Sequence, residues 1–349
     1  MRPRMLPRRR MALRQKGVAV ITALLLTTLA VAIVASLFWQ QQVQVRSMEN
    51  QRLHLQTKWI LRGALDWATL VLRQDGYDNP YTALTHAWAT PLAETRLDQY
   101  IERERVEGEV FDATLSGNII DANSRYNLTN LAKGGMIIDA QVEVLARLLT
   151  HLQLDTALAK RIARTVAEGQ PLEAVPPKEG QNPPPGEGTT PPTGGGTTPS
   201  SAAPVRAQGR APMPLLQVDD LLTVPGMKPE TVEKLRPFVI VLPEGTNLNV
   251  NTAAPELLAA VVDNMSLSQA NALVARRKQA PWKEIAQFQT EAGGKMEPET
   301  ADVKSEYFLV QSRIRLDRAA LDAEALIHRK LGGMGIGAGG TRVVWIRQN

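Results

Sequence analysis

The 349-residue sequence contains no cysteine and only four histidines. Disulfides, thiolate nucleophiles and cysteine-based zinc sites are therefore excluded together. The histidines, His54, His86, His151 and His328, are scattered singly, without metal-ligand spacing or an adjacent nucleophile motif. These absences indicate that the protein is not an enzyme, and the sequence offers no catalytic residue.

Acidic residues are absent from the first seventeen positions, which hold seven basic side chains. Because the formal net charge of the whole chain is +5, the remainder carries −2. Nucleic-acid affinity depends mainly on Lys and Arg side chains that neutralise phosphates. A body with this charge does not favour a nucleic-acid partner.

Charge of either sign is also missing from Val18–Trp39. A run of about 20 apolar residues crosses the hydrocarbon core of a bilayer as a helix. A cleaved secretory signal would have a shorter apolar run and a small-residue cleavage site. No proline occurs between Pro7 and Pro80, so one long helix is predicted from about Val18 to about Arg73. The positive-inside rule keeps the basic leader cytoplasmic and places the rest of the chain outside.

The remainder of the chain changes from strand to helix and back to strand. Two early strands are predicted at Glu109–Ser116 and Asn118–Asp121, with turns at Ser116-Gly117 and Ala122–Ser124. Helical periodicity marks Gln141–Leu152, Ala157–Glu168 and much of Leu215–Phe288, and late strands follow at Tyr307–Leu316, Asp322–Arg329 and the C-terminus. Early and late strands can share one sheet only if the helical block is an insertion between them.

Three segments have a biased composition. Ala174–Pro214 holds eleven of the 23 prolines and is predicted to be a mobile loop or linker. The acidic run Glu102–Glu109 is interspersed with arginines, which indicates a solvated face rather than a metal site. The glycine-rich Gly332–Gly340 precedes a strand and no helix, so it indicates a hairpin loop rather than a phosphate site.

Two stretches, Leu221–Leu235 and Asn247–Phe288, are typical of a helix-hairpin-helix. In DNA-binding versions the hairpin presents backbone N–H groups to a phosphate. Here Pro225-Gly226-Met227 is followed closely by Pro229, which has no N–H, and the second hairpin at Asp263–Ser266 has no glycine. Packing or partner docking is favoured over DNA binding.

A series of further motifs follows the order of the chain. The leader ends in Gln15-Lys16-Gly17 and is followed by the apolar Val18–Leu25. Later segments are NIIDANSRYNLTNL at 118–131, DLLTVPGM at 220–227, LRPFVIVLP at 235–243, NLNVNTA at 247–253 and SEYFLVQSRIRL at 305–316. Together these motifs resemble the type II secretion system protein K family, the large minor pseudopilins, and the resemblance covers essentially the whole chain.

The resemblance implies an α+β protein with a type IV pilin-like fold: a long N-terminal transmembrane helix, an antiparallel sheet and a large all-α insertion domain. The implied organisation is a prepilin leader at 1–17, a transmembrane helix at 18–39, a pilin-like helix and first strands at 40–131, the insertion at 132–300 with its Pro/Gly-rich loop at 174–214, and sheet-completing strands at 301–349.

The resemblance also implies processing. A peptidase would cut between Gly17 and Val18, and the new N-terminus at Val18 would be methylated. Pilin-like families usually have Glu as the fifth mature residue, which pairs with the N-terminal ammonium of a neighbour. Here that residue is Thr22, and nothing in Val18–Trp39 replaces the carboxylate. An unpaired charge in lipid is costly. The amine at Val18 can receive the Glu of the next subunit, but Thr22 offers no carboxylate for joining beneath another subunit. This one-sided pairing predicts a subunit at the tip of the filament.

The function implied is a minor pseudopilin of the type II secretion system that supports protein export across the outer membrane. It would form a heteromeric periplasmic tip with other minor pseudopilins. It would also meet the major pseudopilin, the prepilin peptidase, and the inner-membrane and outer-membrane components of the system. The chain would cross the inner membrane once, with its C-terminal domain in the periplasm.

Bound calcium is a further implication of the resemblance. Calcium takes several oxygen ligands, preferably carboxylates. The region after the first insertion helices offers only Glu168, Glu173, Glu179 and Glu187, so the sequence identifies no metal ligands. The alternative function is a membrane-anchored helix-hairpin-helix DNA receptor for competence, which would need a basic body and intact hairpin glycines. An enzyme is a third hypothesis and would need a constellation of titratable groups.

Overall fold

The computed structural model describes residues 16–97, 113–171, 213–330 and 340–348. It divides into two compact units: one consists of Met1–Arg62, Arg96–Thr114 and Ile314–Leu321, and the other of Gly63–Thr95, Leu115–Arg313 and Asp322–Asn349. The predicted acidic face at Glu102–Glu109 lies outside the described residues, and so does the glycine-rich segment apart from Gly340.

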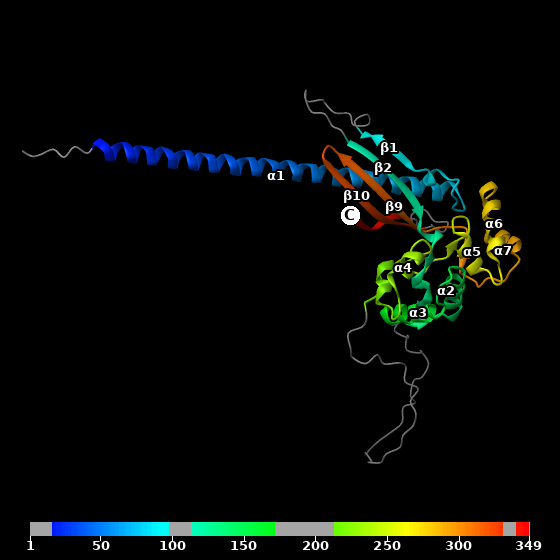
Figure 1. Ribbon diagram of the computed structural model, residues 1–349. Coiled ribbons are helices and arrows are strands. Elements are labelled where there is room, and N and C mark those ends of the chain that lie inside the picture. Colours follow the sequence, from blue (N-terminus) through cyan, green and yellow to red (C-terminus); the bar gives the residue numbers. More distant parts are fainter. Residues whose placement is uncertain (1–15, 98–112, 172–212, 331–339, 349) are drawn as a thin grey trace, which may run out of the picture. The chain divides into compact units, whose positions relative to one another are not determined.

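The first element is the single helix α1 (Lys16–Asp78), as the absence of proline predicts (Figure 1). Among the described residues it is the one helix long and apolar enough to cross a membrane. The hydroxyls of Thr22, Thr27 and Thr28 donate to carbonyls of the preceding turn, so these polar groups are satisfied within the helix, as lipid requires. The helix ends just before Asn79-Pro80, because the residue preceding a proline disfavours the α conformation.

A five-stranded sheet follows the order β1-β2-β9-β10-β11. The strands are β1 (Leu92–Arg96), β2 (Ala113–Asp121), β9 (Tyr307–Leu316), β10 (Ala319–Arg329) and β11 (Thr341–Gln348). Strands β2 and β9 are neighbours although the whole helical block lies between them in sequence. This topology confirms that the helices are an insertion into one sheet.

Strand β2 corrects the turn predicted at Ser116-Gly117, because it runs through both residues without a break. A Cβ atom at Gly117 would lie 2.4 Å from the carbonyl oxygen of Gln311 on β9. The glycine therefore permits a close approach of two neighbouring strands. The second predicted turn is confirmed as the 3₁₀ turn η3 (Ala122–Ser124). Strand β1 had no clear signal in the sequence.

The described part of the insertion contains six helices and several short elements. The helices are α2 (Asp139–His151), α3 (Ala157–Gly169), α4 (Pro229–Leu235), α5 (Pro255–Val261), α6 (Leu267–Gln279) and α7 (Ile285–Ala292). Two-residue ladders join β3 (Tyr126–Asn127) to β6 (Val239–Ile240), β4 (Ala132–Lys133) to β5 (Met136–Ile137), and β7 (Leu248–Asn249) to β8 (Ala301–Asp302). Further 3₁₀ turns are η1 (Ala87–Ala89), η4 (Leu128–Leu131) and η5 (Val218–Thr223).

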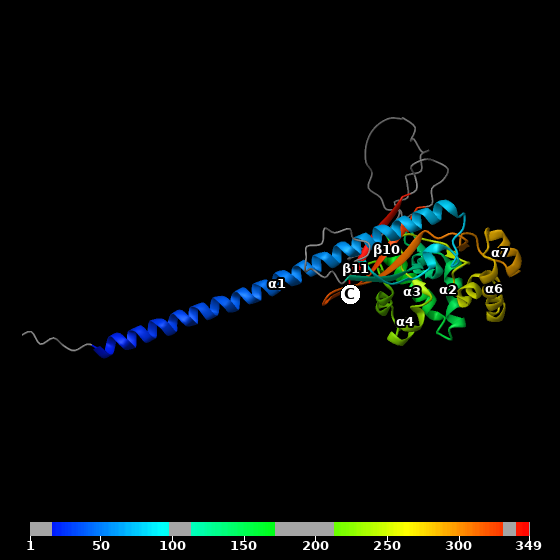
Figure 2. The ribbon, with the colours of Figure 1, turned by 90° about the horizontal axis from the view of Figure 1, so that it is seen from above.

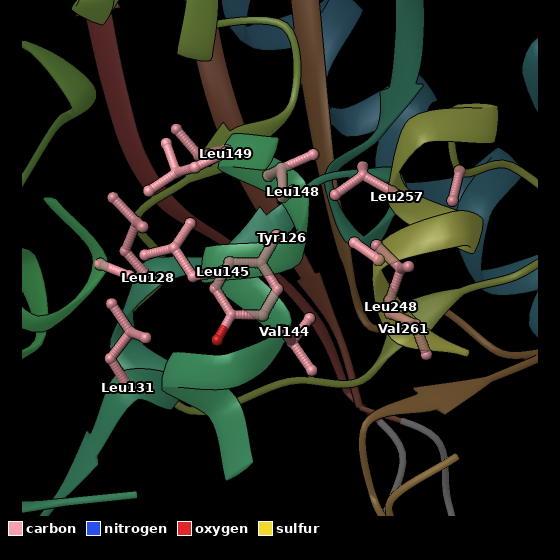
Figure 3. Close-up of a cluster of buried hydrophobic side chains, with 14 of the residues drawn as sticks. Tyr126, Leu128, Leu131, Val144, Leu145, Leu148, Leu149, Leu248, Leu257 and Val261 are labelled. Carbon is pink, nitrogen blue, oxygen red and sulfur yellow. The ribbon is translucent and has the colours of Figure 1, made fainter. Parts of the chain in front are cut away.

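Apolar side chains from most of these helices form one core. The views in Figures 1 and 2 show α2 to α7 gathered as one group. Figure 3 shows the ring of Tyr126 among Val144, Leu145 and Leu148 of α2, and all four are buried. The predicted helices Gln141–Leu152 and Ala157–Glu168 are thus confirmed as α2 and α3, each within two residues at either end. Helical periodicity is reliable here because one face of each helix enters this core.

Candidate functional site

The site residues predicted from the sequence lie at the start of α1. Gly17 and Val18 fall in its first turn. The Thr22 hydroxyl donates to the carbonyl oxygen of Ala19 at 3.0 Å, so this residue is accommodated as a neutral group bonded to its own helix. The cleavage, the methylation and the assembly role stay predictions.

A second site joins three of the segments that carry the family resemblance, 118–131, 247–253 and 305–316. At its centre is the buried carboxylate of Asp121, the last residue of β2. Its Oδ2 atom accepts hydrogen bonds from Asn249 Nδ2 at 2.9 Å, from the Thr252 hydroxyl at 2.6 Å and from the Ser305 hydroxyl at 2.7 Å. Its Oδ1 atom accepts from the backbone N–H of Asn123 at 2.9 Å.

We call Asp121, Asn249, Thr252 and Ser305 the Asp121 clamp, because their contacts hold together the place where the chain enters and leaves the insertion. Asp121 is the entry, Ser305 precedes the exit strand β9, and Asn249 and Thr252 lie in the middle of the insertion. Burial raises the pKa of the Asp121 carboxyl above its ordinary value, although the four hydrogen bonds oppose that shift. The carboxylate oxygens are occupied by protein donors, so the arrangement positions backbone segments and is not built for acid–base chemistry.

The asparagines of the same segments join separate backbone segments through hydrogen bonds of their side chains. Asn123 Nδ2 donates to the carbonyl of Asn247 at 2.9 Å, while its Oδ1 atom accepts from the N–H of Tyr307 at 3.0 Å. Asn251 bonds to both the carbonyl and the N–H of Trp282, at 2.8 and 2.9 Å. An amide side chain matches a peptide group in this two-way fashion because it has both a donor and an acceptor.

Asn127 and Asn130 repeat the pattern toward the loop that precedes β7. Asn127 donates to the carbonyl of Glu244 at 2.7 Å and accepts from the N–H of Leu242 at 3.1 Å. Asn130 donates to the carbonyl of Thr246 at 2.7 Å and accepts from its N–H at 2.9 Å. The asparagine-rich motifs therefore determine how irregular backbone segments of the insertion are held.

The clamp continues into a buried ion pair that the sequence did not reveal. Arg329 at the end of β10 donates to Asp75 Oδ2 at 2.7 Å and to the hydroxyl of Thr82 at 2.8 Å. It also donates to the carbonyl of Ser305 at 3.0 Å, which links it to the Asp121 clamp. His86 Nδ1 lies 2.8 Å from the other oxygen of Asp75. Only the position of Arg329 at the end of a predicted strand could have drawn attention to it.

The helix-hairpin-helix segments are engaged in internal contacts. At the first hairpin, Arg161 of α3 donates to the carbonyl of Pro225 at 3.0 Å, and a Cβ atom on Gly226 would collide with that guanidinium. In the second segment Arg277 points inward and donates to the carbonyl of Val250 at 2.6 Å. Burial lowers the pKa of the Arg277 guanidinium to about 10. Both arginines make internal contacts, which agrees with the packing role that the hairpin sequences favoured, and partner docking stays a prediction.

The calcium expected from the resemblance has no visible ligand set among the described residues. No group of three or more His, Asp or Glu side chains within those ranges could hold a metal ion. Of the four glutamates considered, only Glu168 lies in the described part of the chain, near the end of α3. Calcium binding stays a prediction.

Comparison with known proteins decides the family. Models of "Type II secretion system (T2SS), protein K" match residues 124–244 and 248–310, together just over half of the chain. The chain belongs to the type II secretion system protein K family. It is therefore a minor pseudopilin of that system and not an enzyme, which confirms the identification made from the motifs.

Curated relatives and a solved structure agree. The protein K of Pseudomonas aeruginosa is 29% identical over 86% of this chain and 85% of the relative, and that of Pectobacterium carotovorum is 25% identical over 90% and 93%. The crystal structure of the GspK–GspI–GspJ complex from enterotoxigenic Escherichia coli matches with a TM-score of 0.59 at 19% identity, covering 86% of this chain and 99% of the solved one. This likeness confirms the α+β fold with its inserted helices.

Proposed function

We propose that this protein K is the tip subunit of a periplasmic pseudopilus, assembled with other minor pseudopilins. The solved GspK–GspI–GspJ complex contains two further chains beside GspK, and this chain matches that structure over 86% of its own length. The observation that carries the proposal is Thr22. Its neutral hydroxyl bonds to its own helix, so α1 brings no carboxylate into lipid with which to join beneath another subunit.

The same proposal includes the orientation of the chain across the membrane. The helix α1 is apolar and uncharged over Val18–Trp39 and follows a basic leader, so the leader stays cytoplasmic and the described body is periplasmic. Gly17 and Val18 flank the processed bond, and the free amine at Val18 receives the glutamate of the next subunit. The major pseudopilin, the prepilin peptidase and the envelope components of the secretion system are the remaining partners. Calcium is proposed on the family resemblance alone, and no ligands for it are identified among the described residues.

Two measurements test this proposal. The mass of the mature N-terminal peptide should correspond to a chain that starts at a methylated Val18. Cross-linking in cells should place the unmutated protein with pseudopilin partners on one side only. A mature protein with another first residue, or cross-links throughout the shaft on both sides, would refute the tip assignment. Thr22→Glu should gain incorporation along the shaft, whereas Thr22→Ser, a matched neutral change, should not.

The competence-receptor alternative makes the opposite prediction for DNA. The chain after the leader carries −2, and Arg161 and Arg277 are used in internal contacts. We therefore expect no micromolar binding to duplex DNA at physiological salt. Steeply salt-dependent binding of that strength would instead favour the receptor.

A further inference from the structure

The charges of the chain are unevenly distributed along its length outside the leader. Residues 40–62 contain four basic side chains and one acidic side chain, and the turn region 314–321 adds two basic and one acidic. Together these two segments carry +4, and the leader carries +7. Since the whole chain is +5, everything else carries −6. Both segments belong to one structural unit, which also contains Arg96–Thr114 with a charge of −3, so outside the leader the other unit carries −3 and this unit +1.

That unit brings the two segments together. The side chain of Arg318, in the turn between β9 and β10, forms an ion pair with Glu49 of α1, with Nη2 2.9 Å from Oε2. Both side chains are more than half exposed. Arg46, Arg52 and Arg315 are also exposed. We call Arg46, Arg52, Arg315 and Arg318, with the acidic Glu49 and Asp317, the basic collar.

The length of α1 sets the height of the collar above the membrane. After Lys16 the next charged residue is Arg46. Thirty residues of helix rise about 45 Å, which equals the thickness of a bilayer of about 40–45 Å including its headgroups. Trp39, which is exposed, falls near the boundary of the hydrocarbon core, where Trp is enriched. Arg46 therefore reaches the outer headgroups when the helix begins at the inner ones, whether at Lys16 or, after processing, at the amine of Val18, which is 28 residues and about 42 Å away.

The turn between β9 and β10 lies close to the same surface. Glu49 is three residues after Arg46, a further rise of about 4.5 Å. Arg318, which pairs with Glu49, is thus within about 8 Å, the screening length at physiological salt, of the plane of Arg46. Helix tilt would bring the collar nearer to the bilayer, not further from it.

From this juxtaposition we infer that the basic collar docks on anionic phospholipid headgroups of the outer leaflet of the membrane that α1 spans. The inference rests on the topology in the proposed function. An anionic surface attracts nearby Lys and Arg side chains, and the four arginines of the collar outnumber its two acidic residues. The contact holds the membrane-proximal unit on the bilayer before the subunit enters a filament, and it is broken when the filament lifts the subunit.

The test uses the full-length chain in nanodiscs, either of neutral phosphatidylcholine or with 30% phosphatidylglycerol. Because the chain lacks cysteine, Ala320→Cys gives a single fluorophore site on an exposed residue of the turn region. Headgroup-nitroxide lipids should quench this fluorophore strongly in the anionic discs at low salt, and less at high salt or in neutral discs. Equal quenching in both kinds of disc would overturn the inference.

Charge variants separate this contact from general electrostatics. Arg315→Gln with Arg318→Gln should lower the docked-to-undocked ratio about 30-fold, which corresponds to about 1 kcal/mol per arginine near an anionic surface. Arg315→Gln alone leaves the Glu49 ion pair intact and should give roughly a fivefold loss, at the same energy per residue. The matched change Lys278→Gln with Lys283→Gln removes two exposed charges elsewhere and should leave quenching unchanged.

Insertion is measured on the same samples by resistance to carbonate extraction. A chain that does not insert contradicts the proposed topology, whereas an inserted chain without charge-dependent quenching contradicts only the collar. If the double variant keeps its quenching but loses cross-links to another pseudopilin in cells, the collar is a subunit contact and the lipid inference is wrong.

Discussion

The helical insertion and its attachment to the sheet are stabilised in different ways. The core of the insertion is a cluster of aliphatic and aromatic side chains contributed by several helices. The place where the chain enters and leaves the insertion is instead organised around the carboxylate of Asp121. Apolar packing tolerates exchange of similar side chains, whereas a hydrogen-bonded clamp requires particular donors and acceptors. The difference accounts for the polar residues of two of the motifs, 118–131 and 247–253, which supply Asp121, Asn249 and Thr252 to the attachment.

The largest effect is expected for Asp121→Ala, which tests how much the polar attachment contributes to stability. It removes the acceptor of the buried hydroxyls of Thr252 and Ser305, whereas Asn249 Nδ2 keeps its bonds to the Thr82 carbonyl and the Ser305 hydroxyl. We expect a loss of about 3–5 kcal/mol in the free energy of unfolding, the range for disrupting a buried polar network. Denaturant titration of the full chain in detergent measures it. Asp66→Ala, an exposed carboxylate on α1, is the control and should change stability by less than about 0.5 kcal/mol.

Sequence reasoning succeeded where a pattern has one physical meaning. The long helix, α2, α3 and the late strands follow from missing prolines and apolar periodicity. The residues of the clamp were noted in the sequence only as parts of motifs. Their contacts were not predicted, because nothing local indicates that Asp121 meets Asn249 and Ser305, more than a hundred residues away. The turn predicted at Ser116-Gly117 was wrong, because glycine is needed at 117 to make room for the carbonyl oxygen of Gln311 on the neighbouring strand β9. Long-range contacts determined each outcome that the sequence did not predict.

Gly117 and Gly63 provide a comparison within the sheet and its helix. Gly117→Ala places a Cβ atom against the backbone of β9 and should cost about 1–3 kcal/mol through overpacking. Gly63→Ala meets no atom within 4 Å and lies inside α1, so it should stabilise by about 0.5–1 kcal/mol. Thermal unfolding of the two variants should shift the midpoint in opposite directions. Shifts of the same sign would contradict the close approach of β2 and β9.

The pH dependence of stability gives a further test of the Asp121 clamp. The pKa of Asp121 is raised on folding by burial. Its protonated form is therefore favoured in the folded state, and its contribution to stability is fully present below the unfolded pKa of about 3.9. That contribution is lost as the pH rises through the folded pKa, at up to about 1.4 kcal/mol per pH unit.

Asp121→Asn removes this titration. The difference in unfolding free energy between the natural chain and the variant should shift in favour of the variant as the pH rises above about 4. Denaturant titrations across the acidic to neutral range measure that difference. A constant difference would show that the carboxyl is not perturbed. The variant also brings an amide N–H toward the N–H of Asn123 or toward the other donors, so a constant penalty is expected on top of the pH-dependent part.

The smallest effect is expected for the Pro/Gly-rich segment at 174–214, predicted to be a loop and outside the described residues up to 212, because the described residues that flank it already meet. A Cβ atom on Gly169 would lie 2.8 Å from the Cα atom of Pro214, so the backbone before the loop touches the backbone after it. Replacing residues 174–212 with about six Gly/Ser residues therefore needs no rearrangement of α3 or of the chain that leads to η5. Loop-closure entropy changes only slowly with length, and this shortening should stabilise by roughly 1 kcal/mol.

Secretion of the exported proteins should be unchanged by the same deletion, since the clamp, the sheet and the collar are untouched. The matched control is Gly169→Ala, which leaves the loop intact and pushes its two stems apart; it should cost about 1–3 kcal/mol by overpacking. If the deletion were instead the more damaging change, the loop would have to contribute contacts of its own, to the body or to a partner. A deletion that preserves stability but abolishes secretion would assign those contacts to a partner. If both readouts are preserved, the insertion is complete without the loop and is held by Asp121 and its partners.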